Sequence, residues 1–229
     1  MKEMESIKIV NQKPKKKQES EPNPFEAGGL AGTVYSMLHD MVCILAVIVV
    51  LFVLAARLVG VSGSSMYPTL VGQDKDRRNA GDYLLLRSNF LSSDYEQGDI
   101  VVACVPTFKD GEPIVKRVIA TGGQTVSFRI GEDLQMHVYV DDVLQSEEFI
   151  NEPMSPYGVV SGGFSATVPE GHYFLMGDNR NHSADSREAN IGMVDGRYIV
   201  GKAFWLMFPG QDIYDEMKRD LKRIGDIYD

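Results

Sequence analysis

Ser65 lies in a short segment rich in turn-forming residues, Gly63-Ser-Ser-Met-Tyr-Pro-Thr-Leu70. A serine hydroxyl is a weak nucleophile at neutral pH and needs a neighbouring base that accepts its proton. The polar run at 177–187 contains His182, which could form a serine–histidine–aspartate set with Asp178 or Asp185. Residue types alone leave this alternative open.

Lys116 is the second candidate base. Its neighbours along the chain are apolar, namely Ile114, Val115, Val118 and Ile119. An ordinary lysine has a pKa near 10.4, so only about one side chain in 2,500 is neutral at pH 7. Burial can lower that pKa by up to about 3–5 units and so provide a neutral amine that accepts a proton. A lysine in such a strand-like, apolar context is therefore a candidate partner for the serine.

An apolar run before the serine segment predicts a membrane anchor. Residues 41–56 contain no charged side chain, and Leu58 and Val59 extend the run beyond Arg57. A membrane-spanning helix needs about 20 apolar residues, whereas the apolar part of a cleaved signal peptide has about 7–15. We therefore expect an uncleaved transmembrane anchor at 35–59.

Charge gives the anchor a direction. A lysine cluster at 13–17 precedes the anchor and only Arg57 follows it, so the positive-inside bias places the N-terminus in the cytoplasm. The resulting topology is single-pass type II, with a disordered cytoplasmic tail at 1–34. Residues 58–229 carry 16 basic and 26 acidic side chains. So acidic a surface repels phosphate backbones, which argues against a nucleic acid partner.

After the serine segment, short apolar or alternating runs separated by turn residues predict a mostly β domain. The turn Gly131–Asp133 predicts a hairpin. We expect the domain at 60–210, with a small β-hairpin second lobe at 126–170 and a tail at 211–229 in which 212–224 has helical spacing. The predicted strands are 83–87, 99–103, 115–120, 126–130, 136–140, 172–176 and 198–206.

Together the segments resemble bacterial type I signal peptidases, the membrane-bound serine–lysine proteases. The resemblance covers about residues 38–209, in the order of the family and with its anchor. Its motifs are S-M-x-P-T-L at 65–70, G-D-x-V at 98–101, K-R-[AV]-[IV] at 116–119 and G-D-N-R-x-x-S-x-D-S-R at 177–187. The resemblance implies a signal-peptidase-like β catalytic domain behind one transmembrane helix.

The resemblance also implies a role for each matching polar residue. Ser65 would be the acyl-forming nucleophile, and Lys116 the general base that later activates the deacylating water. Ser183 would hydrogen-bond the neutral lysine, and Asp185 with Arg187 would form a supporting ion pair. The backbone N–H of Ser65 would be one oxyanion donor.

For the substrate, the resemblance implies signal peptides that are cleaved after a small-x-small pattern. Met66, Leu70 and Val115 match the family's pocket positions and are apolar. No metal or organic cofactor is implied, and we expect no site of this kind at the two cysteines, Cys43 and Cys104. The implied partners are secretory preproteins, membrane lipid and the protein-export machinery.

Two rival functions use the same residues differently. One is a specialised peptidase that trims a pilin or a conjugation factor. The other is an inactive, membrane-tethered β domain that binds secreted chains. Activity toward a preprotein separates an enzyme from a binding domain, and a comparison of several preproteins separates a general enzyme from a specialist.

Overall fold

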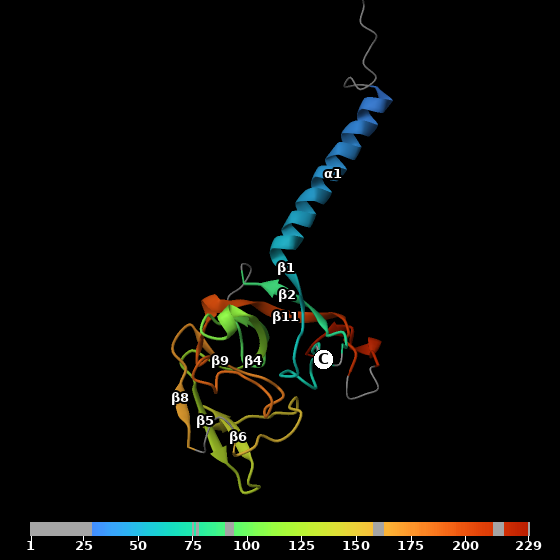
Figure 1. The fold of residues 1–229 in the computed structure, drawn as a ribbon. Helices are drawn as coiled ribbons and strands as arrows, with labels where there is room; N and C mark the ends of the chain where they lie inside the picture. The colour runs from blue at the N-terminus through green and yellow to red at the C-terminus, as the bar shows by residue number, and fades with distance from the viewer. Residues whose placement is uncertain are drawn as a thin grey trace, which may run out of the picture. The chain divides into compact units, whose positions relative to one another are not determined.

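In a computed structural model of the chain, the described residues are 29–74, 76, 78–89, 94–157, 163–212 and 218–228. The chain divides into two compact units, Met1–Val49 and Val50–Asp229. Figure 1 shows a long helix, α1, and a β domain built from labelled strands. Most of the predicted tail at 1–34 lies outside the described residues, and its residues 30–34 belong to α1.

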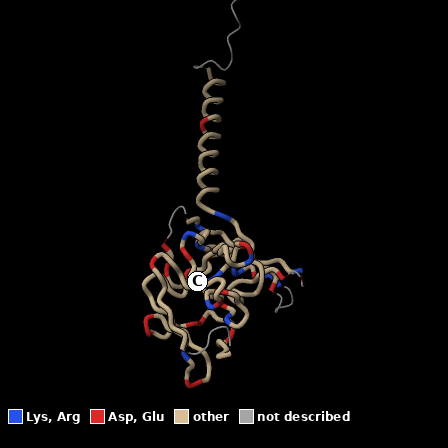
Figure 2. Tube along the Cα trace, turned by 60° about the vertical axis from the view of Figure 1, so that its left-hand side comes forward, with Lys and Arg blue, Asp and Glu red and all other residues tan. Residues whose placement is uncertain are grey.

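Helix α1 spans Leu30–Ala55 and is long and apolar enough to cross a membrane. Its 26 residues correspond to about 39 Å, more than the roughly 30 Å of a bilayer's hydrocarbon core. The most apolar stretch has a mean hydropathy of 2.7 and no buried residues. In Figure 2 the helix is drawn almost entirely without charge, and Asp40 is its one acidic residue.

The anchor prediction of 35–59 is wrong at its end. Strand β1, Ala56–Gly60, follows α1 directly and pairs antiparallel with β2, Tyr83–Ser88. The register runs from Ala56 opposite Arg87 to Gly60 opposite Tyr83. Leu58 and Val59 therefore belong to the sheet, because strand pairing with a distant segment satisfies their backbone groups. Apolar composition alone does not reveal such a partner.

The larger sheet carries the site. Its strand order is β1-β2-β11-β3-β4-β9-β10, and β12 pairs with β11 beside this path. β3 is buried along nearly its whole length because core clusters cover both of its faces, with Val101 and Ala103 in one cluster and Ile100 and Val102 in the other. Besides β1 and β2, the strands of the larger sheet are β3 (Ile100–Cys104), β4 (Pro113–Thr121), β9 (His172–Met176), β10 (Val194–Asp195), β11 (Ile199–Phe208) and β12 (Gly225–Asp226).

The second lobe is a four-stranded sheet of order β7-β6-β5-β8, larger than the hairpin that the sequence predicts. The expected hairpin is present within it, and β7 and β8 flank it. Its buried residues pack with residues of β4 and β9, so the two sheets share a core. The strands are β5 (Thr125–Ile130), β6 (Met136–Val140), β7 (Val143–Leu144) and β8 (Ser165–Thr167).

The seven predicted strands correspond to β2, β3, β4, β5, β6, β9 and β11. The helical spacing at 212–224 does not produce an α-helix where residues of the tail are described. There the chain forms a short 3₁₀ turn, Leu221–Arg223, followed by β12. Pairing with Trp205 and Leu206 of β11 outweighs the weak helical spacing. Two further 3₁₀ turns span Lys109–Gly111 and Gly196–Tyr198.

Candidate active site

The turn that carries Ser65 is fixed by backbone hydrogen bonds. Within it, Tyr67 N–H donates to the Ser64 carbonyl at 3.1 Å, and Leu70 N–H donates to the Met66 carbonyl at 2.9 Å. From outside, Asn179 donates its backbone N–H to the Ser65 carbonyl at 3.0 Å and its side-chain amide to the Ser64 carbonyl at 3.1 Å. The nucleophile is therefore presented by a turn with little freedom to shift.

Met66 and Leu70 anchor this turn from below. Both side chains are almost completely buried, in a core cluster that also contains Leu84 and Leu86 of β2. Neither of them lines the pocket beside Ser65, whereas Val115 does. In this structure both are core residues, and the assignment of Met66 and Leu70 to substrate pockets stays a prediction. An apolar residue type alone does not show whether a side chain lies in the hydrophobic core or lines a substrate pocket.

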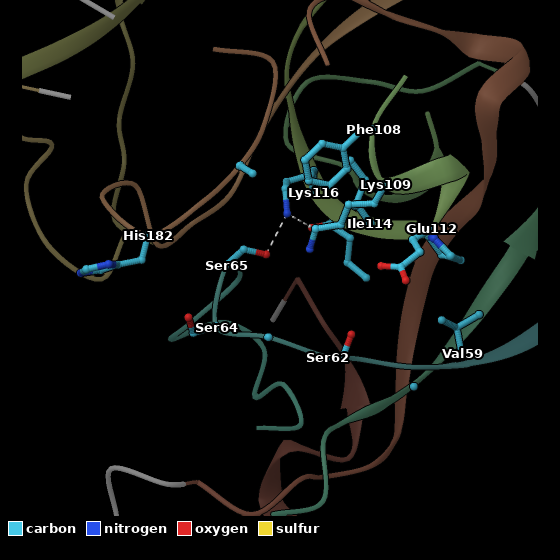
Figure 3. A pocket seen from close by; sticks show the side chains of 15 residues that line it. Val59, Ser62, Ser64, Ser65, Phe108, Lys109, Glu112, Ile114, Lys116 and His182 are labelled. Atoms are coloured by element: carbon cyan, nitrogen blue, oxygen red, sulfur yellow. Dashed lines mark hydrogen bonds between the residues drawn. The ribbon is translucent and has the colours of Figure 1, made fainter. Parts of the chain in front are cut away.

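Strand β4 brings Lys116 against Ser65 (Figure 3). The Lys116 Nζ lies 2.7 Å from Ser65 Oγ and 3.0 Å from the Val115 carbonyl oxygen. Lys116 is only 3% exposed. Alternation along the strand puts it on the same face as Val118, which is fully buried. A serine and a buried lysine 51 residues apart in sequence thus meet at hydrogen-bonding distance.

Burial lowers the pKa of Lys116 from 10.5 to about 8, although the nearby carboxylates Asp185 and Asp178 act to raise it. At pH 7 a pKa of 8 leaves about one amine in ten neutral. A neutral amine has two N–H groups and one lone pair. The Val115 carbonyl can only accept, so it takes an N–H and leaves the lone pair available to the Ser65 hydroxyl.

His182 does not reach the nucleophile. Its imidazole is exposed and points away from Ser65 in Figure 3. Its nearest charged partner is Glu152, with Nε2 and Oε1 3.9 Å apart. The carboxylates of Asp178 and Asp185 are engaged by arginines. The structure therefore does not assemble the serine–histidine–aspartate alternative.

Asp185 and Arg187 form a buried ion pair. Arg187 Nε donates to Asp185 Oδ1 at 2.7 Å and its terminal nitrogen donates to Oδ2 at 2.8 Å. Gly177 N–H also donates to Asp185, at 3.0 Å. Burial acts to raise the pKa of Asp185, but the bonds from Arg187 and Gly177 outweigh it and hold that pKa below its usual value. The pair thus fixes the loop that follows β9.

Ser183 does not hold the lysine as expected. Its hydroxyl is buried and makes no hydrogen bond to Lys116, and it lies close enough to the Asp185 carboxylate to help lower the pKa of that group. The Lys116 amine contacts Ser65 and the Val115 carbonyl in its place. A Cβ built on Gly177 would lie 2.3 Å from Ser183 Oγ and 2.4 Å from the Ser65 carbonyl oxygen. Ser183 therefore lies beside the nucleophile without bonding to the base.

A second polar network supports the site, and of its members the sequence suggested a role only for Asp178, as a possible partner of His182. Asp178 is fully buried and accepts two hydrogen bonds from Arg117, at 2.9 and 2.7 Å, and one from the Thr69 hydroxyl at 2.6 Å. The Arg117 guanidinium also lies 4.0 Å from the centre of the Phe149 ring. Asp178 and Arg117 lie inside the motifs quoted above, so those motifs could have identified them. Thr69 links this network to the nucleophile turn.

An open pocket of about 260 Å³ lies in front of Ser65 and Lys116. One wall comes from β1 and the nucleophile turn, and the other from the segment that leads into β4. Figure 3 shows Lys109, Glu112 and Ile114 beside the pair, and Ser62 and Val59 on the other wall. β1 on one wall and the start of β4 on the other are extended strands, a shape that suits an extended peptide, whereas Lys109–Gly111 form a 3₁₀ turn.

A serine whose hydroxyl contacts a buried amine is the arrangement of a hydrolase that uses lysine as its base. The sequence matches the signal peptidase family, peptidase S26, over residues 34–208. The chain belongs to this family.

Three relatives illustrate the similarity. Thylakoidal processing peptidase 1 of Arabidopsis thaliana is 30% identical over 70% of this chain and 44% of its own length. Signal peptidase I of Pseudomonas aeruginosa is 34% identical over 51% of each chain. Signal peptidase I U of Bacillus subtilis is 31% identical over 65% of this chain and 74% of its own. The chain thus spans about half the length of the first two relatives, and about three quarters of the third.

Family and helix together indicate that the protein is anchored in a membrane.

The matched range begins inside α1 and ends at the last residue of β11. Residues 209–229, which include β12, lie outside the match.

Proposed function

We propose that the protein is a signal peptidase I, a serine endopeptidase that removes signal peptides from secretory preproteins after a small-x-small pattern. Ser65 is the nucleophile and Lys116 the general base. The observation that carries the proposal is the 2.7 Å contact between Lys116 Nζ and Ser65 Oγ in a pocket that a peptide can enter. Membership of the signal peptidase family supports the substrate class.

Acylation begins when the Ser65 hydroxyl donates its proton to the neutral Lys116 amine. The oxygen attacks the carbonyl carbon at the cleavage site, and the negative charge moves to the carbonyl oxygen, where the Ser65 backbone N–H can bind it. The protonated amine then gives its proton to the leaving nitrogen. The C–N bond breaks, the mature protein departs, and the signal peptide remains as an ester on Ser65.

Deacylation uses the same base. Lys116, neutral again, takes a proton from a water molecule, and the resulting oxygen nucleophile attacks the ester carbon. The C–Oγ bond breaks, the proton returns to Ser65, and the signal peptide leaves with a free carboxylate. In each step the amine gains and loses one proton, and it must stay at a fixed distance from the reacting oxygen. The buried position of Lys116 holds the amine at that distance.

The strand segments that line the pocket, in β1 and at the start of β4, can pair with a substrate in strand conformation. Val115 lines the pocket on the base side, and Val59, Gly60 and Ser62 line the other. In a pocket of about 260 Å³ a small side chain next to the scissile bond can be accommodated more easily than a large one. We therefore assign Val115 to substrate contact and leave Met66 and Leu70 in the core.

We propose a type II topology, with a cytoplasmic N-terminus and an extracytoplasmic catalytic domain that starts at β1. The anchor is then α1, and the catalytic domain at 56–210 includes the second lobe at 126–170. The lysine cluster at 13–17 supports this direction and offers a contact to anionic lipid. A preprotein held in the same bilayer then meets the site at a high local concentration, and the export machinery that delivers it is the expected partner.

Cleavage of a preprotein with an Ala-x-Ala site tests this function. We expect the full chain in detergent to release the mature protein with its natural N-terminus, as determined by mass spectrometry. Ser65→Ala should release none, because no ester can form. As a matched control, a preprotein with a bulky residue in place of the alanine at −1 should resist cleavage. Absence of cleavage by the wild type across several preproteins would contradict the proposal and favour a specialist or a binding domain.

The pH dependence of cleavage follows from the lysine. Since its pKa lies near 8 and the neutral form is the active one, kcat/KM should fall about tenfold for each pH unit below 8 and level off above it. Initial rates between pH 5.5 and 9.5 at low substrate concentration measure this limb. A limb centred near pH 6.5, the usual range of histidine, would contradict the assignment of the base.

A further inference from the structure

Residues 218–228 lie outside the matched family range, yet they are attached to the catalytic sheet. Strand β12 pairs with β11, with Gly225 opposite Leu206 and Asp226 opposite Trp205. The Tyr228 hydroxyl donates to the Ala203 carbonyl at 2.9 Å and accepts from the backbone N–H at the start of β3 at 2.8 Å. In Figure 1 this red segment lies beside the chain that follows β1. These contacts hold the segment at 218–228 to β11 and β3 at several positions.

The segment places Arg223 against the nucleophile turn. The Arg223 guanidinium donates to the Thr69 carbonyl at 2.9 Å, to Asp82 Oδ2 at 2.7 Å and to Asp82 Oδ1 at 3.1 Å. Asp82 is fully buried and also accepts the backbone N–H groups of Val71 and Gly210, at 2.8 and 2.6 Å. One buried carboxylate thus joins the end of the turn to Arg223 and to the chain that leaves β11.

Thr69 is the link to catalysis. Its carbonyl accepts from Arg223, while its hydroxyl donates to Asp178. Asp178 is paired with Arg117, the residue after the base. The turn is therefore held on one side by Asp178 and Asn179 and on the other by Asp82 and Arg223.

We propose that Arg223 is a positioning residue for the signal peptidase reaction, because it fixes the nucleophile turn through Thr69 and Asp82 and so sets Ser65 against Lys116. The inference rests on the proposed function. Arg223 touches neither the substrate nor the reacting atoms. Its guanidinium is suited to the task because its planar fork reaches the carbonyl and both carboxylate oxygens at once.

The effect expected from losing Arg223 lies mainly in kcat. A small displacement of a nucleophile can cost about 100-fold in rate, whereas the pocket walls that bind substrate stay in place. Asp82 keeps its two backbone partners, so the fold can persist while the turn gains freedom. A lysine at 223 can reach one acceptor but cannot span all three, and should restore part of the rate.

The test compares Arg223→Gln and Arg223→Lys with Lys222→Gln, which removes a positive charge from the exposed neighbour. Each full chain is assayed in detergent for kcat and KM on a preprotein, and for thermal unfolding. We expect kcat to fall about 10- to 100-fold in Arg223→Gln and less in Arg223→Lys, with KM within about twofold in both. Lys222→Gln should match the wild type.

A second readout does not depend on the preprotein. The rate at which a small organophosphonate modifies Ser65, followed by the mass increase, reports the serine–lysine geometry directly. It should fall in parallel with kcat in the Arg223 variants. In Thr69→Val/Arg223→Gln, the rate should fall less than the product of the two single effects, because both residues hold the same turn.

Either of two results would overturn the inference: a modification rate per folded molecule equal to that of the wild type in both Arg223 variants, or effects of Thr69→Val and Arg223→Gln that simply multiply. If Arg223→Gln does not fold, Arg223→Lys alone decides by the same criterion. Normal modification of the wild type without cleavage of any preprotein would instead contradict the proposed function, and the modification rates of the Arg223 variants would then test only whether Arg223 positions Ser65 against Lys116.

Discussion

Lys116→Met is expected to reduce kcat/KM for preprotein cleavage by about 10³-fold or more at pH 8. A positioned general base typically contributes about 10²–10⁴-fold, and methionine fills the same space without accepting a proton. Quantifying the mature protein released by equal amounts of folded enzyme measures the loss. Retention of more than about a tenth of the wild-type activity would contradict the role of Lys116.

The same substitution should stabilise the fold. The folded-state pKa of Lys116 is about 8 and the ordinary value is 10.5, so the unfolded chain binds this proton more tightly. As pH falls from 10.5 to 8, the wild type therefore loses up to about 3 kcal/mol of free energy of unfolding, and below 8 the loss is complete. Lys116→Met should gain most over the wild type below pH 8 and least above 10.5. Unfolding in detergent, followed by Trp205 fluorescence, checks this trend.

Gly177→Ala should also reduce the rate of preprotein cleavage strongly, although Gly177 takes no part in the chemistry. The added Cβ would lie 2.4 Å from the Ser65 carbonyl oxygen and 2.3 Å from Ser183 Oγ, both too close for unstrained contact. Relief requires the nucleophile turn or the loop after β9 to shift. We expect a loss of about 1–3 kcal/mol in the free energy of unfolding and about 100-fold in kcat.

Gly177→Ala/Ser183→Gly separates the contacts with Ser183 from the contact with Ser65. Removing the whole Ser183 side chain relieves the contacts with its Oγ and its Cβ, at 2.3 and 2.6 Å, but not the one with the Ser65 carbonyl oxygen, so the double variant should recover part of the stability but little of kcat. Full recovery of kcat in the double variant would show that the contact with Ser183, and not the one with Ser65, limits activity. Wild-type kcat in Gly177→Ala itself would contradict the close packing of this turn.

Local sequence patterns predicted the strands well because alternation and turn residues act over a few positions. The hairpin of β5 and β6 follows from the turn at 131–133 in this way. β1 was missed because residues 56–60 continue an apolar run, and only their partner β2 makes them a strand. β12 was missed for the same reason, since it depends on β11.

The motifs predicted which residues form the site more accurately than they predicted the contacts between those residues. Ser65 and Lys116 meet as the resemblance implies, and Asp185 pairs with Arg187. The bond expected from Ser183 to the lysine is absent among the described contacts, in which the amine contacts Ser65 and the Val115 carbonyl. No motif contains Arg223, whose contacts with Thr69 and Asp82 join residues that are 154 and 141 positions apart in the sequence.

The identity of the base is the central claim, and the pH dependence of Ser65 modification by an organophosphonate tests it most directly. The reaction is followed by mass in the wild type, Lys116→Met and His182→Ala, each folded and at equal concentration. We predict a half-maximal rate near pH 8 in the wild type, the same profile in His182→Ala, and almost no reaction in Lys116→Met. Reaction that persists in Lys116→Met and disappears in His182→Ala would contradict the serine–lysine mechanism and assign the base to histidine.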